Sequence, residues 1–246
     1  MWNNKRVSVV LPAYNEAKNI RSAVQEFLAI PVVDEVVVVD NNSKDETARL
    51  ACEAGARVVA EKRQGFGFAL QRGMAEVHGD LIVLCEPDDT FQARDLYKLV
   101  SYSEDFDMVL GTRTTQQLIW QGANMGPALR LGNLFVAKLL ELLFGGPSLS
   151  DCGCTFRLLT RSAYVNVRPH LTVGGSHFLP EMVVQGLLRK QRVIEIPVNY
   201  RGRVGVSKIT GSFGKTLLTG GSMILLILLV RCRTLMPPSL KAQVVR

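Results

Sequence analysis

The first apolar run of the sequence is not followed by the Gly-x-Gly-x-x-Gly fingerprint of dinucleotide-binding proteins, and the chain has no Walker A motif. The run closes instead in the stretch Leu11-Pro-Ala-Tyr-Asn-Glu16, and the later Gly65-Phe-Gly67 lacks a third glycine. Such glycines are needed where a backbone turn must approach a pyrophosphate closely. Their absence argues against dehydrogenases and P-loop NTPases.

Cysteine is sparse as well, and its pattern excludes a zinc site. The chain has five cysteines, of which Cys152-Gly-Cys154 is one short pair without a second pair or a histidine cluster to complete a tetrahedral site. We therefore expect reduced, buried thiols in a cytosolic protein. No apolar signal segment precedes the first strand, so secretion is not expected.

Dense basic runs with interleaved aromatic residues are also missing, although the formal net charge is +7. Nucleic acid is therefore not an expected partner, whereas a membrane surface or a phosphorylated small molecule fits the positive charge. The length of 246 residues and the hydrophobic fraction of 47% suit one large α/β domain with a sizeable core.

Short apolar runs alternate with helical patterns along most of the chain. The predicted strands are 7–11, 34–40, 57–60, 80–85, 107–111 and 192–196. The predicted helices are 15–28, capped by Asn15, 43–55, capped by Ser43, 68–78, 129–144 and 180–189. This alternation predicts a mostly parallel central sheet flanked by helices.

In such a sheet, ligands bind beyond the carboxyl ends of the strands. The residues that follow the predicted strands are polar: 12–16, 40–45, 86–90 and 112–113. Among them, Glu86 and Asp88 form a carboxylate pair that can hold Mg²⁺ or Mn²⁺ and leave coordination positions for a diphosphate. The alternative is an ordinary turn, since Pro-Asp-Asp is common turn chemistry.

A segment of 15 uncharged residues, 216–230, lies near the C-terminus between Lys215 and Arg231. This is shorter than the roughly 20 residues that a helix needs to cross a bilayer. Its cationic flanks favour a helix lying at the membrane interface, with a final core helix as the alternative and a single full span least favoured. We accordingly divide the chain into a domain at 1–210 and an apolar helix and tail at 211–246.

Six motifs occur in an order that resembles family 2 glycosyltransferases, and within them the polyprenyl-phosphate sugar synthases of the dolichol-phosphate mannose synthase type. The resemblance extends from Val7 to about Lys208. The motifs are Leu11-Pro-Ala-Tyr-Asn-Glu16, Val38-Val-Asp-Asn-Asn-Ser-Lys-Asp-Glu-Thr47, Gln64-Gly-Phe-Gly-Phe-Ala-Leu70, Asp151-Cys-Gly-Cys-Thr-Phe-Arg157, Glu195-Ile-Pro-Val-Asn-Tyr200 and Gly205-Val-Ser-Lys208.

The resemblance implies a GT-A-type domain that transfers one hexose from a nucleotide-diphosphate sugar (GDP-mannose or UDP-glucose type) to polyprenyl phosphate, with inversion and with Mg²⁺ or Mn²⁺. For the donor, it implies contacts to the base and ribose from Pro12, Tyr14, Glu16 and Asp40. It also implies a glycine loop at Gly65 and Gly67 and a metal pair at Glu86 and Asp88.

For the acceptor, the resemblance implies that Arg113 and Arg130 hold the lipid phosphate. Asp151 corresponds to an acidic residue near the reacting centre, and Glu181 to one on a helix that faces the site. A mobile loop over the phosphates corresponds to Arg201, Arg203, Ser207 and Lys208. The expected location is cytoplasmic, peripherally associated with the inner face of the membrane.

Three positions depart from the family pattern. Glu86 stands where the family usually has aspartate, Asn41 replaces a second aspartate, and Gly202 replaces an arginine but is flanked by Arg201 and Arg203. Two alternatives stay open: a family 2 enzyme with a soluble or polysaccharide acceptor, and a non-catalytic nucleotide-binding membrane adaptor. The sequence leaves the oligomeric state, the sugar and the base open.

Overall fold

The computed structural model describes residues 1–203 and 213–236, and within them seven strands form one sheet in the order β3-β2-β1-β4-β6-β5-β7. The strands are β1 (Val7–Ala13), β2 (Glu35–Asp40), β3 (Arg57–Ala60), β4 (Leu81–Leu84), β5 (Met108–Thr112), β6 (Arg157–Thr160) and β7 (Val193–Pro197). Only β6 runs antiparallel to its neighbours, β4 and β5. The predicted mostly parallel α/β sheet is confirmed.

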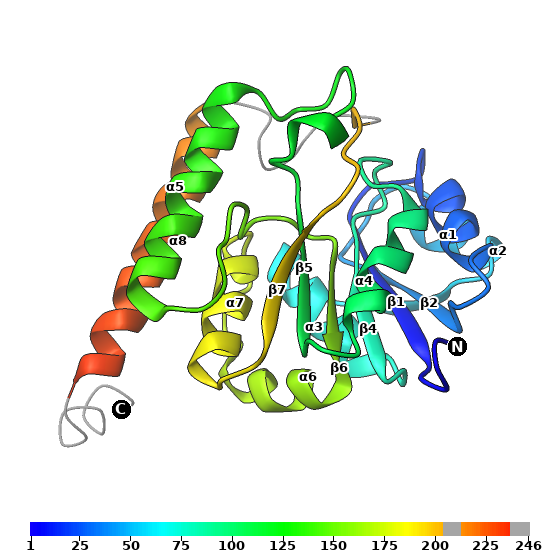
Figure 1. Ribbon diagram of the computed structural model, residues 1–246. Coiled ribbons are helices and arrows are strands. Elements are labelled where there is room, and N and C mark those ends of the chain that lie inside the picture. Colours follow the sequence, from blue (N-terminus) through cyan, green and yellow to red (C-terminus); the bar gives the residue numbers. More distant parts are fainter. Residues whose placement is uncertain (204–212, 237–246) are drawn as a thin grey trace.

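Helices cover both faces of the sheet (Figure 1). One face carries α1 (Ile20–Leu28), α2 (Thr47–Glu53) and α4 (Leu96–Tyr102). The other carries α3 (Phe66–Glu76), α5 (Pro127–Phe144), α6 (Arg161–Val167), α7 (Phe178–Leu188) and α8 (Phe213–Leu235). Short 3-10 turns occupy Ala93–Asp95, Gln116–Leu118 and Arg168–His170.

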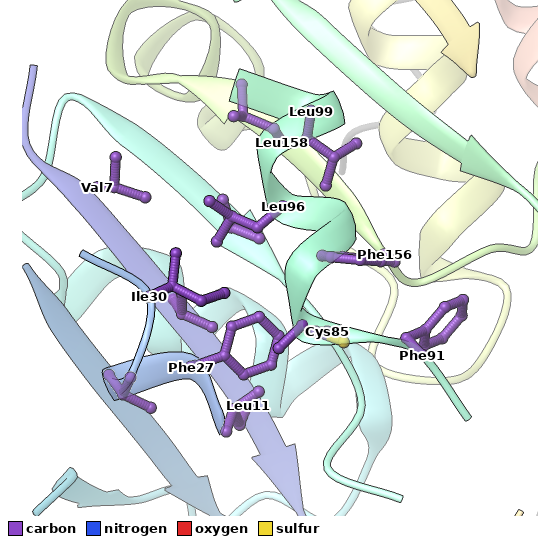
Figure 2. Packing of buried hydrophobic residues seen from close by; sticks show 14 of the residues in the cluster. Val7, Leu11, Phe27, Ile30, Cys85, Phe91, Leu96, Leu99, Phe156 and Leu158 are labelled. Atoms are coloured by element: carbon purple, nitrogen blue, oxygen red, sulfur yellow. The ribbon is translucent and has the colours of Figure 1, made fainter. Parts of the chain in front are cut away.

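The two cores follow from the alternation of side chains along the buried strands. Val7, Val9 and Leu11 of β1 point to the first face, while Val10 points to the second. In the first core, Phe27 of α1 packs together with strand residues and with α4 (Figure 2). Because both faces of the central strands are covered, the carboxyl edge is the part of the sheet left for ligands.

Two helices begin later than the sequence predicts, because their expected caps are used elsewhere. Helix α1 begins at Ile20 and α2 at Thr47. The Ser43 hydroxyl accepts a hydrogen bond from the Asn15 backbone N–H at 3.0 Å, and the Asn15 side chain accepts one from the Lys44 N–H at 2.7 Å. These polar side chains therefore tie the loops after β1 and β2 together rather than capping helices.

Sequence reasoning did not identify α4, α6 or β6 as elements. The two helices have seven residues each, which is too short for a clear helical period. The antiparallel direction of β6 has a functional consequence, because its first residues lie at the edge where the parallel strands end. The preceding segment 151–156 is thereby brought to the carboxyl edge.

The C-terminal apolar segment forms α8, which lies against α5 and α7 along one side of the molecule (Figure 1, orange-red). Its stretch Leu217–Leu235 is long and apolar enough to cross a membrane by length and composition, yet only 6% of it is buried. Exposed leucines such as Leu218, with 74% of its surface accessible, argue against the core-helix alternative. Helix α5 also exposes Phe135 and Leu142.

Candidate active site

A pocket of about 200 Å³ lies beyond the carboxyl ends of β1 and β4. Three residues predicted to bind the nucleotide, Pro12, Tyr14 and Glu16, line it together with the predicted metal pair and Arg203. Asp40 does not line the pocket; its carboxylate accepts a hydrogen bond from the Ser43 N–H at 3.3 Å. Asp40 is half-buried and binds the loop that follows β2.

Asn41, which departs from the family pattern, is buried and organises one wall of this pocket. Its side-chain amide donates to the carbonyls of Glu61 and Arg63, each at 2.8 Å. Its side-chain oxygen accepts from the Gly65 N–H at 2.8 Å and from Gln64 at 3.2 Å. An ionised aspartate has no proton to donate to two carbonyls, so asparagine matches this loop better.

The two glycines of the third motif are required by close backbone packing. A Cβ on Gly67 would lie 2.3 Å from the Val173 carbonyl oxygen, and one on Gly65 would lie 2.3 Å from that of Gly174. The Gly67 N–H donates to the Gly174 carbonyl at 2.8 Å. Neither glycine lines the pocket, whereas Phe66 between them does.

Glu181 holds the loop against which these glycines pack. It is buried, and its carboxylate accepts hydrogen bonds from the N–H groups of Thr172 and Val173 and from the Thr172 hydroxyl, at 2.8–3.1 Å. It lines neither pocket. The partner of this buried carboxylate is thus the backbone at 172–173, and Glu181 lies outside the lining of both pockets.

Glu86 and Asp88 meet Arg203 at the mouth of the pocket. The Nη1 atom of Arg203 lies 3.0 Å from Oδ2 of Asp88 and 3.7 Å from Oε2 of Glu86, and its Nη2 lies 3.0 Å from Oε1 of Glu16. Burial and then the negative charge of Asp88 raise the pKa of Glu86 to about 7. Burial and the neighbouring carboxylate thus disfavour the charged form of Glu86, and a bound cation would favour it.

The other oxygens of the pair are fixed by hydroxyl groups. Thr155 donates to Oε1 of Glu86 at 2.6 Å, and Thr90 donates to Oδ1 of Asp88 at 2.5 Å. One oxygen of each carboxylate is left toward the pocket. Within residues 1–203 and 213–236 no cluster of three or more acidic, histidine or cysteine side chains suits a metal ion. Two hard oxygen ligands fit Mg²⁺, which usually keeps several positions for phosphate or water.

A second, larger cavity of about 930 Å³ continues from the first. The two share the side chains of Phe66, Glu86, Asp88 and Arg203. Beyond this junction the lining is mostly apolar and comes largely from α5 and α8; it includes Leu129, Phe135, Val136, Leu217, Met223 and Ile224. Arg113 and Tyr200 lie in the wall contributed by the sheet edge.

Arg113 lines this cavity and is held from behind by Asp151. Its Nε and Nη2 atoms lie 2.7 and 2.9 Å from the two carboxylate oxygens, and its guanidinium lies 5.4 Å from the ring centre of Tyr200. Asp151 is fully buried and does not line the cavity. Its N–H, with that of Ser150, is in turn held by Glu195 of β7.

Arg130 and Arg201 lie at the margins of the site. Arg130 donates to the Thr114 carbonyl at 3.0 Å and does not line the cavity. Arg201 lies 3.4 Å from Asp89 and 5.2 Å from the ring centre of Trp120. Ser207 and Lys208 lie outside the described residues, as does the domain boundary proposed at 210.

Arg157, at the end of the Asp151–Arg157 motif, is held by backbone carbonyls. Its buried guanidinium donates to the carbonyls of Cys152, Cys154 and Leu179 at 3.0–3.2 Å. Burial lowers its pKa to about 10. Arg157 thus fixes the 152–154 loop against α7 by using carbonyls that no sequence pattern reveals.

Solved structures of glycosyltransferases share this fold. Glucosyl-3-phosphoglycerate synthase from Mycobacterium tuberculosis, in complex with Mn²⁺, UDP and phosphoglyceric acid, aligns with a TM-score of 0.72 at 23% identity over 96% of this chain and 81% of that chain. The same enzyme with Mg²⁺ and UDP gives 0.71 at 22% identity, over 93% and 80% of the two chains. The GT-A-type fold is confirmed.

Residues 8–168 match the model of glycosyl transferase family 2. The chain belongs to glycosyl transferase family 2, and it is a glycosyltransferase. It is similar to dolichyl-phosphate hexose transferase of Haloferax volcanii, with 29% identity over 82% of this chain and 86% of that protein. It is also similar to the hexosyltransferase Agl6 of the same organism, 29% identical over 82% of this chain, but the match spans about half of Agl6 (49%).

Proposed function

We propose that the protein transfers one hexose, with inversion, from a nucleotide-diphosphate sugar to a polyprenyl phosphate at the cytoplasmic face of a membrane. The observation that carries this proposal is the junction of the two pockets. A small pocket that holds Glu16 and a large, mostly apolar cavity meet at Glu86, Asp88 and Arg203, and Arg113 lines the cavity. A sugar diphosphate in the first and a lipid phosphate in the second would meet at that point.

The chemistry assigned to the junction is mainly electrostatic. Mg²⁺ or Mn²⁺ held by Glu86 and Asp88 supplies stabilisation to the charge that develops on the leaving diphosphate. Arg113 orients the acceptor phosphate through two parallel hydrogen bonds. Arg130, which lies outside the cavity lining, donates to the carbonyl of Thr114, the residue that follows Arg113. Asp151 keeps the Arg113 guanidinium in one orientation.

The acceptor phosphate is already an anion, so no general base is needed. One of its oxygens attacks the anomeric carbon from the side opposite the diphosphate. The new carbon–oxygen bond forms as the bond to the diphosphate breaks, and the electron pair leaves with the nucleoside diphosphate. A residue that positions the phosphate therefore contributes more to this reaction than one that removes a proton.

The lipid part of the acceptor is assigned to the cavity between α5 and α8, whose outer surfaces are apolar. The exposed leucines of α8 and the cationic side chains Arg231 and Arg233 near its end suit contact with a bilayer. The similarity to a protein named dolichyl-phosphate hexose transferase supports the same acceptor class. The free cysteines fit a reducing, cytoplasmic location.

The test uses the full chain with Mg²⁺, polyprenyl phosphate in vesicles, and GDP-mannose, UDP-glucose or UDP-N-acetylglucosamine in turn. We expect one donor to label the lipid fraction, and the proposal fails if none does. Asp88→Asn should abolish turnover while circular dichroism shows that the variant is folded, whereas Asp89→Asn, beside it but outside both pockets, should stay active. A membrane adaptor would tolerate both changes.

The acceptor is tested separately at Gly132 of α5, which lines the cavity and faces open space. Gly132→Leu should fill part of the cavity and lower the rate with polyprenyl phosphate, while nucleotide binding stays as in the wild type. A soluble or polysaccharide acceptor would instead give activity without vesicles, and this activity would be indifferent to the substitution.

A further inference from the structure

Arg203 is placed among three carboxylates from two different loops. Glu16 follows β1, while Glu86 and Asp88 follow β4. The guanidinium lies within 3.0 Å of Glu16 and Asp88 and within 3.7 Å of Glu86, and only 18% of its side chain is exposed. Arg203 therefore forms ion pairs with all three carboxylates and balances part of their charge.

The oxygens that Arg203 contacts are the ones a divalent ion would need. The second oxygens of Glu86 and Asp88 are held by the hydroxyls of Thr155 and Thr90, so Oε2 and Oδ2 remain for coordination. Mg²⁺ binds such oxygens at about 2.0–2.1 Å. A dication there would lie against the guanidinium, and the two like charges would repel each other strongly in a partly buried site.

The hydrogen bonding of Arg203 is also incomplete. Its Nε atom is buried and has no partner among the described residues. A guanidinium offers five N–H donors, and the oxygens of a diphosphate can accept in the parallel geometry that suits it. Arg203 lines both pockets, so a nucleotide diphosphate bound beside Glu16 lies within its reach.

We propose that Arg203 occupies the divalent-metal position of the donor-free enzyme and is released from it to the donor diphosphate. This inference rests on the proposed metal role of Glu86 and Asp88. Metal alone must then compete with an internal cation, whereas metal and nucleotide together supply both a replacement charge and a new partner for Arg203. Because linkage is reciprocal, metal and nucleotide each strengthen the binding of the other.

The experiment measures Mn²⁺ binding by the EPR signal of free Mn²⁺, with the full chain and no sugar donor or lipid. Arg203→Gln removes the competing charge, and Arg94→Gln removes one arginine charge from an exposed position as the matched control. Titrations are made without nucleotide and with saturating UDP or GDP, and circular dichroism checks that each variant is folded.

Without nucleotide, Arg203→Gln should bind Mn²⁺ on the order of tenfold more tightly than the wild type. In the variant, Mn²⁺ no longer has to displace a guanidinium from a partly buried ion pair, which is stronger than an exposed one. Arg94→Gln should stay within about twofold of the wild type. With nucleotide, Arg203→Gln should no longer bind Mn²⁺ more tightly than the wild type, because the variant also lacks the contact between the Arg203 guanidinium and the diphosphate. The nucleotide thus enhances Mn²⁺ binding less in this variant than in the wild type.

Equal or weaker Mn²⁺ binding by Arg203→Gln without nucleotide overturns the proposal, while the metal role of the carboxylates stands if Asp88→Asn still abolishes binding. If Asp88→Asn binds Mn²⁺ as the wild type does, the metal assignment itself is wrong and the Arg203 proposal falls with it. The two failures are therefore distinguishable within one set of titrations.

Discussion

Replacing Asp151 by asparagine tests how the protein holds Arg113 at the edge of its acceptor cavity. Asp151 is fully buried, and it accepts hydrogen bonds from Nε, Nη2 and the backbone N–H of Arg113 at 2.7, 2.9 and 3.2 Å, and from the Gly153 N–H at 3.2 Å. Asparagine has nearly the same shape but no charge. The substitution removes the ion-pair partner of a guanidinium that has only 15% of its side chain exposed.

Removing one partner from a buried ion pair typically costs about 3–5 kcal/mol. Arg113 keeps its contact with Tyr200 and some solvent, so we expect the lower end, about 3 kcal/mol. For a chain of this size, that loss corresponds to a fall in Tm of roughly 6–12 °C.

The pair formed by Asp107 and Arg192 is a matched control. Asp107 also accepts from the backbone N–H, Nε and Nη2 of its arginine, at 2.8, 3.3 and 3.0 Å, but 61% of the Arg192 side chain is exposed. Asp107→Asn should therefore cost about 1 kcal/mol or less. The difference between the two variants isolates burial, because the hydrogen-bond geometry is similar.

The stability difference should also depend on pH. Burial alone would raise the pKa of Asp151, but the charge and hydrogen bonds of Arg113 hold it below the ordinary value of 3.8. A carboxyl with a lowered folded-state pKa stabilises the protein fully above its unfolded-state pKa and loses this effect as the pH falls through the folded-state pKa. The gap between wild type and Asp151→Asn should therefore be constant from about pH 5 to 7 and shrink below about pH 4.

The assay is urea unfolding followed by tryptophan fluorescence and circular dichroism at several pH values. A loss below about 1 kcal/mol at pH 7, equal to that of Asp107→Asn, would refute the argument that burial makes the pair at Asp151 strong. A gap that does not change between pH 5 and pH 3 would contradict the lowered pKa.

Three further predictions concern the pocket wall and the apolar helices. Asn41→Asp should weaken UDP or GDP binding and lower the Tm, because an aspartate cannot donate to two carbonyls. Asn42→Asp also loses two donated hydrogen bonds, but these are exposed to solvent, so its effect on the Tm and on binding should be smaller; thermal shift with Mn²⁺ compares the two variants. Gly67→Ala should destabilise by about 1–3 kcal/mol in urea unfolding because its Cβ meets a backbone carbonyl at 2.3 Å, and an unchanged midpoint would contradict this packing. Replacing Leu142 and Leu218 by serine should reduce sedimentation with anionic vesicles without changing nucleotide binding, and undiminished sedimentation would count against these helices as the membrane contact.

The sequence by itself determined the class of the fold and the edge of the sheet at which its polar motifs lie. Continuous β-branched runs such as 35–40 form strands buried on both faces, and polar residues directly after them lie at the ligand edge whatever the details of packing. The ends of β1 and β4 carry Pro12, Tyr14, Glu16 and the carboxylate pair. Their convergence was predictable because the carboxyl ends of parallel strands meet at one edge of the sheet.

The tertiary structure decided which polar groups face the pockets and which hold them in place. Glu181, Asp151 and Arg157 are all buried charged side chains, but their partners lie on loops that no local pattern pairs with them. The 151–156 segment reaches the site because β6 runs antiparallel to its neighbours. With four residues, β6 is too short to show a strand periodicity in the sequence.

The contacts of Arg203 likewise could not be predicted from the sequence, because its carboxylate partners lie 187, 117 and 115 positions earlier in the chain. A periodic or local motif reports interactions across a few residues, whereas the charge balance of a site depends on which loops the sheet brings together. The exposure of α8 was decided in the same way, since an apolar sequence of this length occurs both in core helices and in membrane helices.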